Sequence, residues 1–561
     1  MSSDRRPILS RPRLIATLLL SQLFLLFAIT DLGILAGSAP GKSLFPLALF
    51  LPAIALCIFT KERREWMIAS VWSLILWGTA IVAAIPLCDY SYDGNVYHQE
   101  IIAAICNGWT PGTPNPSGME LSLWSLHYAK GIEIAASTVV KFTGLIESGK
   151  GINIILCLIP GFMIYDFCKL YFPAMGRRER WLTAVVTVGN PVCIMQSLTY
   201  YIDFSKYIYT SLAIILLIEI LSGRRREKWS SLSMLAMTII LASATKFNAF
   251  FEIGVVCIAA VILLIYRHRI RQATRLAIFC LIVAMTGVLL FGWHPYATNL
   301  LTAGHPLYPL MGEGAVDIMT GNTPPEFIDG NRFSNFFSSL FSFERLGADT
   351  RHGGFGPLMG PLLLLACLTV WKSRNLRGAG PVSLYIAVWI LASCFFFEQS
   401  WWARYIAQLW ILVPQGLIMA FASGIGTSPG ARWWRIDAWG IGFLGFCSIL
   451  LSGYFLLIQS GRVSLYRQTV KSVLSGETVA VYGLTDSYAR QLKEMGITAL
   501  LTDSLNEECY QVAHFGTIAL PDAYPVMMVD SIRGTEIRRR LESLPFDYSP
   551  AFETDPKKLP K

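Results

Sequence analysis

A long series of apolar segments limits what this chain can fold into. Hydrophobic residues make up 54% of its 561 residues, charged residues only 15%, and the mean hydropathy is +0.50. Soluble domains carry about one quarter charged residues, so this composition indicates an integral membrane protein. We expect an all-α membrane bundle of about 13 crossing helices, at 14–35, 44–60, 66–87, 151–172, 181–198, 208–221, 230–244, 253–266, 276–293, 357–371, 382–397, 406–425 and 439–459.

The basic residues predict how this bundle is oriented. Four arginines precede the first apolar segment, and every second loop after it is basic, namely 61–65, 177–180, 224–228, 267–275, 372–377 and 432–435. Because basic loops stay in the cytoplasm, we expect a cytoplasmic N-terminus and two long outer loops, 88–150 and 294–356. The net charge of +9 might suggest binding to nucleic acid, but it is explained by these basic loops. We therefore exclude nucleic acid as a partner. The chain lacks Asn-x-Ser/Thr sequons, which is compatible with a bacterial inner-membrane protein.

The tail after the last apolar segment has the pattern of a small folded domain. Residues 461–561 alternate short apolar runs at 479–483, 499–503 and 526–530 with helical patterns such as SYARQLKEMG. This alternation predicts an α/β domain. An odd number of crossings places it outside the cytoplasm, after a membrane domain that covers 1–460.

A polar cluster follows the third apolar segment, at the start of the first outer loop. Residues 89–100 read DYSYDGNVYHQE, and we take Asp93, Asp89, His98 and Glu100 as candidate catalytic residues. Polar groups at a membrane boundary need a partner or a function. NVYHQEIIAAIC has helical spacing of its apolar residues, which predicts a short amphipathic helix along the membrane surface. In the alternative interpretation, Asp93 only caps this helix.

Six further residues on the outer side are candidates for substrate binding. They are His127 and Lys130 in the first loop, His294 and His305 in the second, Arg404 in the link EQSWWARY, and Lys246 at a helix end. A fixed arginine at headgroup depth suits a lipid phosphate. The alternatives are an aromatic belt with an anchoring arginine around Arg404, and a snorkelling side chain for Lys130.

The histidines and cysteines do not have the spacing of a metal site. The chain has neither HExxH nor paired CxxC motifs, so we predict no zinc site. Proton transfer or phosphate contact suits the outer histidines better.

The pattern of motifs resembles the GT-C superfamily of membrane glycosyltransferases. The resemblance covers the architecture of about the first 420 residues, and it is strongest to bacterial members with YDGxxYHQ, here at 92–99. GW at 108–109, HYxKG at 127–131 and GHPLYP at 304–309 follow. The spacing of Asp89 and Asp93 departs from the compact acidic pair of better-known members, which leaves open which aspartate acts.

The resemblance implies transfer of a sugar from a polyprenyl-phosphate-type carrier to an envelope glycan, lipid or protein acceptor outside the cytoplasmic membrane. It maps the catalytic carboxylate to Asp93, with Asp89 second, and it implies inversion at the sugar. A leaving phosphate needs positive charge, for which Arg404 with Lys246 or Lys130 is available. No cofactor is required by this chemistry, and use of a divalent metal stays open because some relatives use one.

Two other functions compete with sugar transfer. An O-antigen-type polymerase or ligase would use similar outer arginines and histidines but would join whole oligosaccharides. A membrane transporter would place its ionisable groups near the middle of the bilayer. This sequence places them at one face.

Overall fold

The computed structural model describes residues 9–59, 62–223, 228–341, 346–349, 354–424, 429–504, 509–513, 525–546 and 548. Parts of the predicted loops, at 60–61, 224–227, 342–345 and 350–353, lie outside the described residues.

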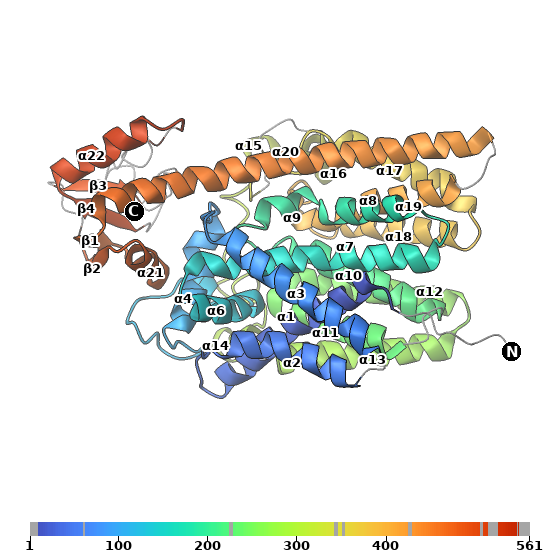
Figure 1. The fold of residues 1–561 in the computed structure, drawn as a ribbon, viewed down its shortest axis with the longest axis horizontal. Coiled ribbons are helices and arrows are strands. Elements are labelled where there is room, and N and C mark those ends of the chain that lie inside the picture. Colours follow the sequence, from blue (N-terminus) through green and yellow to red (C-terminus); the bar gives the residue numbers. More distant parts are fainter. Residues whose placement is uncertain are drawn as a thin grey trace.

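The described chain is a helical bundle with a small mixed domain at one end (Figure 1). The long helices of the bundle are α1 (Arg11–Leu35), α2 (Leu44–Phe59), α3 (Arg63–Ala84), α7 (Gly151–Tyr171), α8 (Arg177–Val188), α10 (Ser205–Ser222), α11 (Lys228–Thr245), α12 (Phe247–Tyr266), α13 (Ile270–Leu289), α17 (Met359–Lys372), α18 (Ala379–Ser393), α19 (Leu412–Ser423) and α20 (Pro429–Leu474). Their side chains form one continuous apolar core.

The structure supports a helical membrane protein, with fewer clear crossings than the sequence predicts. Within the described residues, eight helices are long and apolar enough to cross a membrane, and three apolar helices are shorter. The 13 predicted crossings are therefore not confirmed. Two of the predicted spans are too short or interrupted, since α17 has 14 residues and the segment 181–198 is divided.

The interruption of the segment 181–198 has a local cause. α8 ends at Val188 and α9 (Pro191–Gln196) begins two residues later. Pro191 stands at the first position of α9, and the Asn190 side chain accepts a hydrogen bond from Val192 N. Proline favours a helix start and opposes a helix interior, so the apolar run forms two short helices.

Helix α1 lies at the centre of the N-terminal half of the bundle, where it packs on α2, α3, α6, α7 and α11. Ser10 caps it and Pro12 lies in its first turn. The amide group of Gln22 is satisfied within the core, because Gln22 Nε2 donates to Leu49 O at 2.9 Å and Trp77 Nε1 donates to Gln22 Oε1 at 3.1 Å. A polar group that is buried this deeply destabilises the fold unless it has hydrogen-bond partners.

The loop 88–150, which we continue to call the first outer loop after its predicted side, contains η1 (Gly94–His98), α4 (Gln99–Cys106), α5 (Leu123–His127), α6 (Gly131–Thr143) and η2 (Ile146–Lys150). The predicted surface helix exists, but its position differs from the prediction. Every residue of α4 is buried, because α6 and α21 pack over it. The amphipathic pattern therefore reflects packing against protein on several sides.

The remaining short elements of the bundle are η3 (Trp293–Ala297), α14 (Thr298–Ala303), α15 (Pro325–Ile328), α16 (Arg332–Leu340), η4 (Ser373–Asn375) and η5 (Ala403–Ile411). Those between α13 and α17 belong to the second long loop.

The C-terminal residues form the predicted α/β domain. Its elements are β1 (Thr478–Tyr482), α21 (Asp486–Glu494), β2 (Thr498–Thr502), β3 (Tyr510–Ala513), β4 (Val526–Val529) and α22 (Ser531–Glu542). The sheet order is β2-β1-β4-β3, with β1 and β2 parallel and the other two pairs antiparallel. β1, α21 and β2 form a crossover unit, and the sheet packs on its own apolar core.

Helix α20 joins the two parts without a break and carries the chain from the far end of the bundle to the sheet (Figure 1). The domain then contacts the first outer loop through α21. Asn107 Nδ2 donates to Asp486 Oδ1 at 2.8 Å, Gln491 Nε2 donates to Gln99 Oε1 at 2.6 Å, and Ile146 N donates to Glu494 Oε1 at 2.8 Å.

Candidate active site

Arg404 is the centre of a buried ionic cluster at the end of the bundle that bears the C-terminal domain. It is the second residue of η5, and its side chain is 9% exposed. Arg404 Nη1 lies 2.9 Å from Asp93 Oδ2 and 3.6 Å from Asp203 Oδ2, and Arg404 Nε lies 3.3 Å from Asp349 Oδ1. Segments that are far apart in the sequence therefore meet at one guanidinium group.

Lys246 completes this group of charges. It precedes α12 with an extended backbone, and its Nζ forms a very close ion pair with Asp203 Oδ1. We refer to Asp93, Asp203, Lys246, Asp349 and Arg404 as the Arg404 cluster. Its three carboxylates and two cations give a formal charge of −1 (2 − 3).

The Arg404 cluster is partly open. The side chains of Asp93, Lys246 and Asp349 are 16%, 22% and 32% exposed, whereas Asp203 is enclosed at 1%. Burial acts to raise the pKa of Asp203, but the charges of Lys246 and Arg404 outweigh it and the pKa is lowered. Asp203 is therefore a fixed anion that holds both cations, and the side chains of Asp93 and Asp349 remain partly exposed.

Aromatic rings enclose Arg404 on its other sides. The guanidinium carbon lies 4.2 Å from the centre of the Trp402 ring, 5.1 Å from that of Tyr201 and 5.5 Å from that of Tyr405. Rings at these distances attract a cation and restrict its rotation. The predicted aromatic surroundings of Arg404 are present, together with carboxylate partners that an anchoring residue would not need.

Asp93 does not act as a helix cap. Its backbone is already helical, and its side chain makes no capping hydrogen bond to η1. Asp93 Oδ2 instead accepts a hydrogen bond from Arg404 Nη1. The alternative in which Asp93 only caps the helix is therefore wrong in this structure.

His98 is held by a residue that the sequence analysis did not select. Its Nδ1 makes a very close contact with Glu133 Oε1, and both side chains are almost fully enclosed. Within the described residues, His98 Nε2 has no hydrogen-bond partner. His98 is also one of the groups that lower the pKa of Asp203, so it stands beside the Arg404 cluster.

The other two candidate catalytic residues serve the loop itself. Asp89 is fully buried, and its carboxylate accepts hydrogen bonds from Ser91 N at 2.7 Å, Ser91 Oγ at 2.7 Å and Tyr200 N at 2.8 Å. Glu100 accepts from Ser122 N at 3.1 Å and Ser122 Oγ at 3.0 Å, and also from Ser125 Oγ. Burial raises the pKa of both carboxyl groups. These bonds fix the loop, and we assign Asp89 and Glu100 to structure.

Lys130 does not reach the cluster through any hydrogen bond or ion pair among the described residues. Its Nζ donates to Leu126 O at 2.9 Å and to Tyr128 O at 2.6 Å, and the side chain is buried. Burial lowers the pKa of Lys130 to about 7. The alternative interpretation of Lys130 as a snorkelling side chain is therefore wrong, because the amine is turned into the protein.

The three remaining histidines lie in the two outer loops, and His127 connects one loop to the other. His127 Nδ1 lies 2.8 Å from Asn299 Oδ1, and its ring packs on Tyr308 at 4.7 Å. His305 Nδ1 accepts from Leu307 N at 3.1 Å. Burial, with Lys130 nearby, lowers the pKa of His294 to about 4. These positions favour a structural role in holding the loops together.

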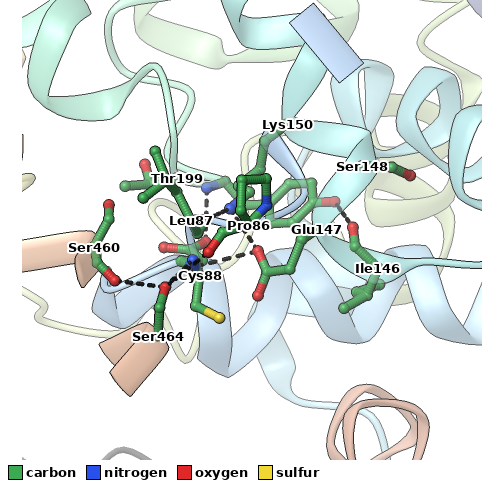
Figure 2. A network of polar contacts seen from close by, with 12 residues as sticks. Pro86, Leu87, Cys88, Ile146, Glu147, Ser148, Lys150, Thr199, Ser460 and Ser464 are labelled. Atoms are coloured by element: carbon green, nitrogen blue, oxygen red, sulfur yellow. Dashed lines mark hydrogen bonds and ion pairs between the residues drawn. The ribbon is translucent and has the colours of Figure 1, made fainter. Parts of the chain in front are cut away.

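A second ionic group, which we call the Glu147 cluster, lies where α3, η2 and α20 meet. It consists of Glu147, Lys150 and Arg467, and Figure 2 shows Glu147 and Lys150 beside the backbone at 86–88. Lys150 Nζ lies 2.6 Å from Glu147 Oε2, and Arg467 Nη1 makes a very close contact with Glu147 Oε1. Ser464 on α20 adds a hydrogen bond from Cys88 N at 2.9 Å. This cluster ties α20 to the start of the first outer loop.

Among the described residues, no group of three or more His, Cys, Asp or Glu side chains is arranged to hold a metal ion. The carboxylates of the Arg404 cluster are paired with cations instead.

These features define a class, a helical protein whose described residues include eight helices that are long and apolar enough to span a membrane, a C-terminal α/β domain and a partly exposed ionic cluster at one end of the bundle. Comparison with known proteins does not narrow that class, since no family model and no curated protein matches the chain.

Proposed function

We propose that this protein is a membrane glycosyltransferase that moves a sugar from a polyprenyl-phosphate-type lipid to a hydroxyl acceptor of the cell envelope, at the face that carries the C-terminal domain. The observation that carries the proposal is the pairing of Asp93 with Arg404 in a partly open cluster that also contains Lys246. A base and two cations at one membrane face are what transfer from a lipid phosphate requires.

Each step of the proposed transfer can be assigned to one of these residues. Asp93 takes the proton of the acceptor hydroxyl as the acceptor oxygen forms its bond to the anomeric carbon. The bond between that carbon and the phosphate oxygen breaks, and the phosphate leaves with the electron pair. Lys246 is the more exposed of the two cations, so it is the better placed to meet the developing phosphate charge.

Arg404 has a different part in this scheme. Its carboxylate contacts and the rings around it fix its position, and it in turn fixes Asp93. We assign Arg404 to orienting the base, and a direct contact of Arg404 with phosphate stays a prediction. His98 lies beside the same cluster, and its contact with Glu133 helps to position η1.

The distribution of charge along the helices favours chemistry at a face over transport. In seven of the eight candidate spans, every Asp, Glu, Lys and Arg lies within six residues of a span end. In the eighth, the segment from Asp437 to Arg462 has no charged residue between its ends. A transporter binding site near the middle of the bilayer would need polar groups there.

The proposal is tested by removing the carboxylate of Asp93. Asp93→Asn keeps the size of the side chain and an oxygen for Arg404, so we expect a normal fold and a loss of transfer of about 10²- to 10⁴-fold. The exposed residue Asp329, in the second outer loop, provides the matched control Asp329→Asn. Transfer is measured by mass analysis of lipid-linked sugars and surface glycans in cells that carry only the variant.

The outcomes separate the candidate functions. Loss of a single sugar from the glycan, with the lipid-linked donor accumulating, supports transfer. Accumulation of single repeat units instead supports a polymerase or ligase, and full activity of Asp93→Asn removes Asp93 as the base.

A further inference from the structure

A large apolar groove lies at the other end of the bundle, away from the Arg404 cluster. Its volume is about 540 Å³, and it lies among α7, α10, α18 and α19. Its wall runs along α10 from Tyr207 to Ser222, about 22 Å at the rise of an α-helix. Asp203 precedes the opposite end of α10, so the mouth of the groove is remote from the Arg404 cluster.

The interior of the groove suits hydrocarbon. Ile214, Ile218 and Ile386 contribute to its walls, and nearby polar groups turn toward the protein. Tyr207 donates its hydroxyl to Thr187 O at 2.6 Å, and Gln415 Nε2 donates to Ser383 O at 2.6 Å. Half of a bilayer core is about 15 Å thick, so the groove is deep enough for the chain of a lipid from one leaflet.

Two arginines stand at the mouth of the groove. Arg267 follows the end of α12 and Arg377 precedes α18, and both are exposed residues that line the groove. Within the described part of the chain, neither guanidinium has a hydrogen-bond or ion-pair partner. Unpaired guanidinium groups beside an apolar groove complement a lipid phosphate.

The length of the groove helps to distinguish among lipids. A wall of about 22 Å matches an extended acyl chain of an ordinary phospholipid, whereas a polyprenyl chain of many isoprene units is longer. A second, smaller cavity of about 70 Å³ shares the lining residues Ile214, Ile218, Val382 and Ile386, and it is too small for another chain.

We infer that this groove binds an anionic phospholipid, with its phosphate on Arg267 and Arg377 and one acyl chain between α10 and α18. The inference is independent of sugar transfer, because it uses no residue of the Arg404 cluster. Such a lipid fills the space beside α18 and links it to α10 and α12.

The test is lipid binding to the full-length protein, purified in detergent and examined by native mass spectrometry with added phosphatidylglycerol, phosphatidylcholine or a polyprenyl phosphate. The double variant R267A/R377A removes the two charges at the mouth. From the usual contribution of a basic residue near a lipid phosphate, we expect phosphatidylglycerol to bind about 30-fold more weakly than to the wild type. The matched control R271A/R275A removes two exposed arginines of α13 at the same end of the bundle, and its binding is expected to stay within about twofold.

A second variant tests the groove itself. Ala422→Trp places a large ring at a half-buried lining position near the mouth, and we expect it to lower phosphatidylglycerol binding while both arginines remain. Equal binding by R267A/R377A and its control, equal binding of phosphatidylcholine, or preference for the polyprenyl phosphate would each overturn the inference. Gel filtration and the melting temperature without added lipid establish that the variants are folded.

Discussion

The Arg404 cluster and the Glu147 cluster are both buried groups of charge at the same end of the molecule, yet they differ in access. The side chains of the Glu147 cluster are between 0% and 10% exposed, and backbone groups use its charges. In the Arg404 cluster, by contrast, Asp93, Lys246 and Asp349 remain partly exposed. Burial of charge alone therefore does not distinguish the two clusters, whereas the exposure of their paired side chains to solvent does.

Neutralising one carboxylate in each cluster tests whether the two clusters differ in their contribution to stability, since both carboxylates are paired with an arginine. Glu147→Gln leaves Lys150 and Arg467 buried without their anion, so we expect a loss of about 3–5 kcal/mol in the free energy of unfolding. Asp93→Asn leaves Arg404 with Asp203 and Asp349, and its expected loss is below about 1 kcal/mol. Equilibrium unfolding in mixed micelles measures both.

Equal losses of stability in these two variants would contradict the distinction between the clusters. An Asp93→Asn protein that is strongly destabilised would show that the Arg404 cluster is also mainly structural.

The next effect concerns Lys246, the more exposed of the two cations in the Arg404 cluster. Lys246→Gln removes positive charge from the place where we expect the leaving phosphate, so transfer should fall by about 10- to 100-fold. Lys42→Gln, at an exposed position in the loop between α1 and α2, is the matched control. Transfer is compared at several donor concentrations, and a rate indistinguishable from that of the control would remove Lys246 from the phosphate site.

The smallest predicted effect is a pH dependence from a buried amine outside both clusters. The pKa of Lys130 in the folded state is about 7, below its ordinary value of 10.5, so the unfolded state holds the proton more tightly. The contribution of Lys130 to the free energy of unfolding is therefore largest above about pH 10.5, and it decreases as the pH falls toward 7. The melting temperature of the wild type should therefore gain more between pH 7 and pH 9 than that of Lys130→Met.

An identical pH response in Lys130→Met and the wild type would show that the amine is not the source. Lys42→Met controls for the loss of an exposed lysine.

The sequence was informative about local patterns and about the candidate residues of the first loop. Alternation of apolar runs and helical patterns predicted the α/β domain, including β1, β2, β4 and both helices, and the structure confirms it. β3 was missed. The segment 181–198 shows why the number of crossings was overestimated, because its hydropathy continues across a proline that ends one helix and starts another.

The sequence could not show which residues, far apart in the chain, contact each other in the folded protein. Asp93 and Arg404 were each selected, but the pairing of residues 311 positions apart depends on the packing of the whole bundle. Asp203 and Asp349 were missed because a single aspartate in a short link or a long loop has no pattern of its own. Asp89 and Glu100 look like Asp93 in the sequence, and only their hydrogen bonds show that they fix the loop.

Helix α20 runs without a break from the bundle to the C-terminal domain, so a tilt of this helix would be transmitted to the first outer loop. A helix of 46 residues is about 69 Å long, more than twice the thickness of a bilayer core. Helices adjust to bilayer thickness by tilting, and a tilt of about 10° moves the far end of such a helix by about 12 Å. Because α21 is hydrogen-bonded to that loop at Asn107 and Gln99, a movement of the C-terminal end of α20 would pull on the segment that begins with Asp93. A change in the thickness of the surrounding bilayer would then alter the geometry of the Arg404 cluster.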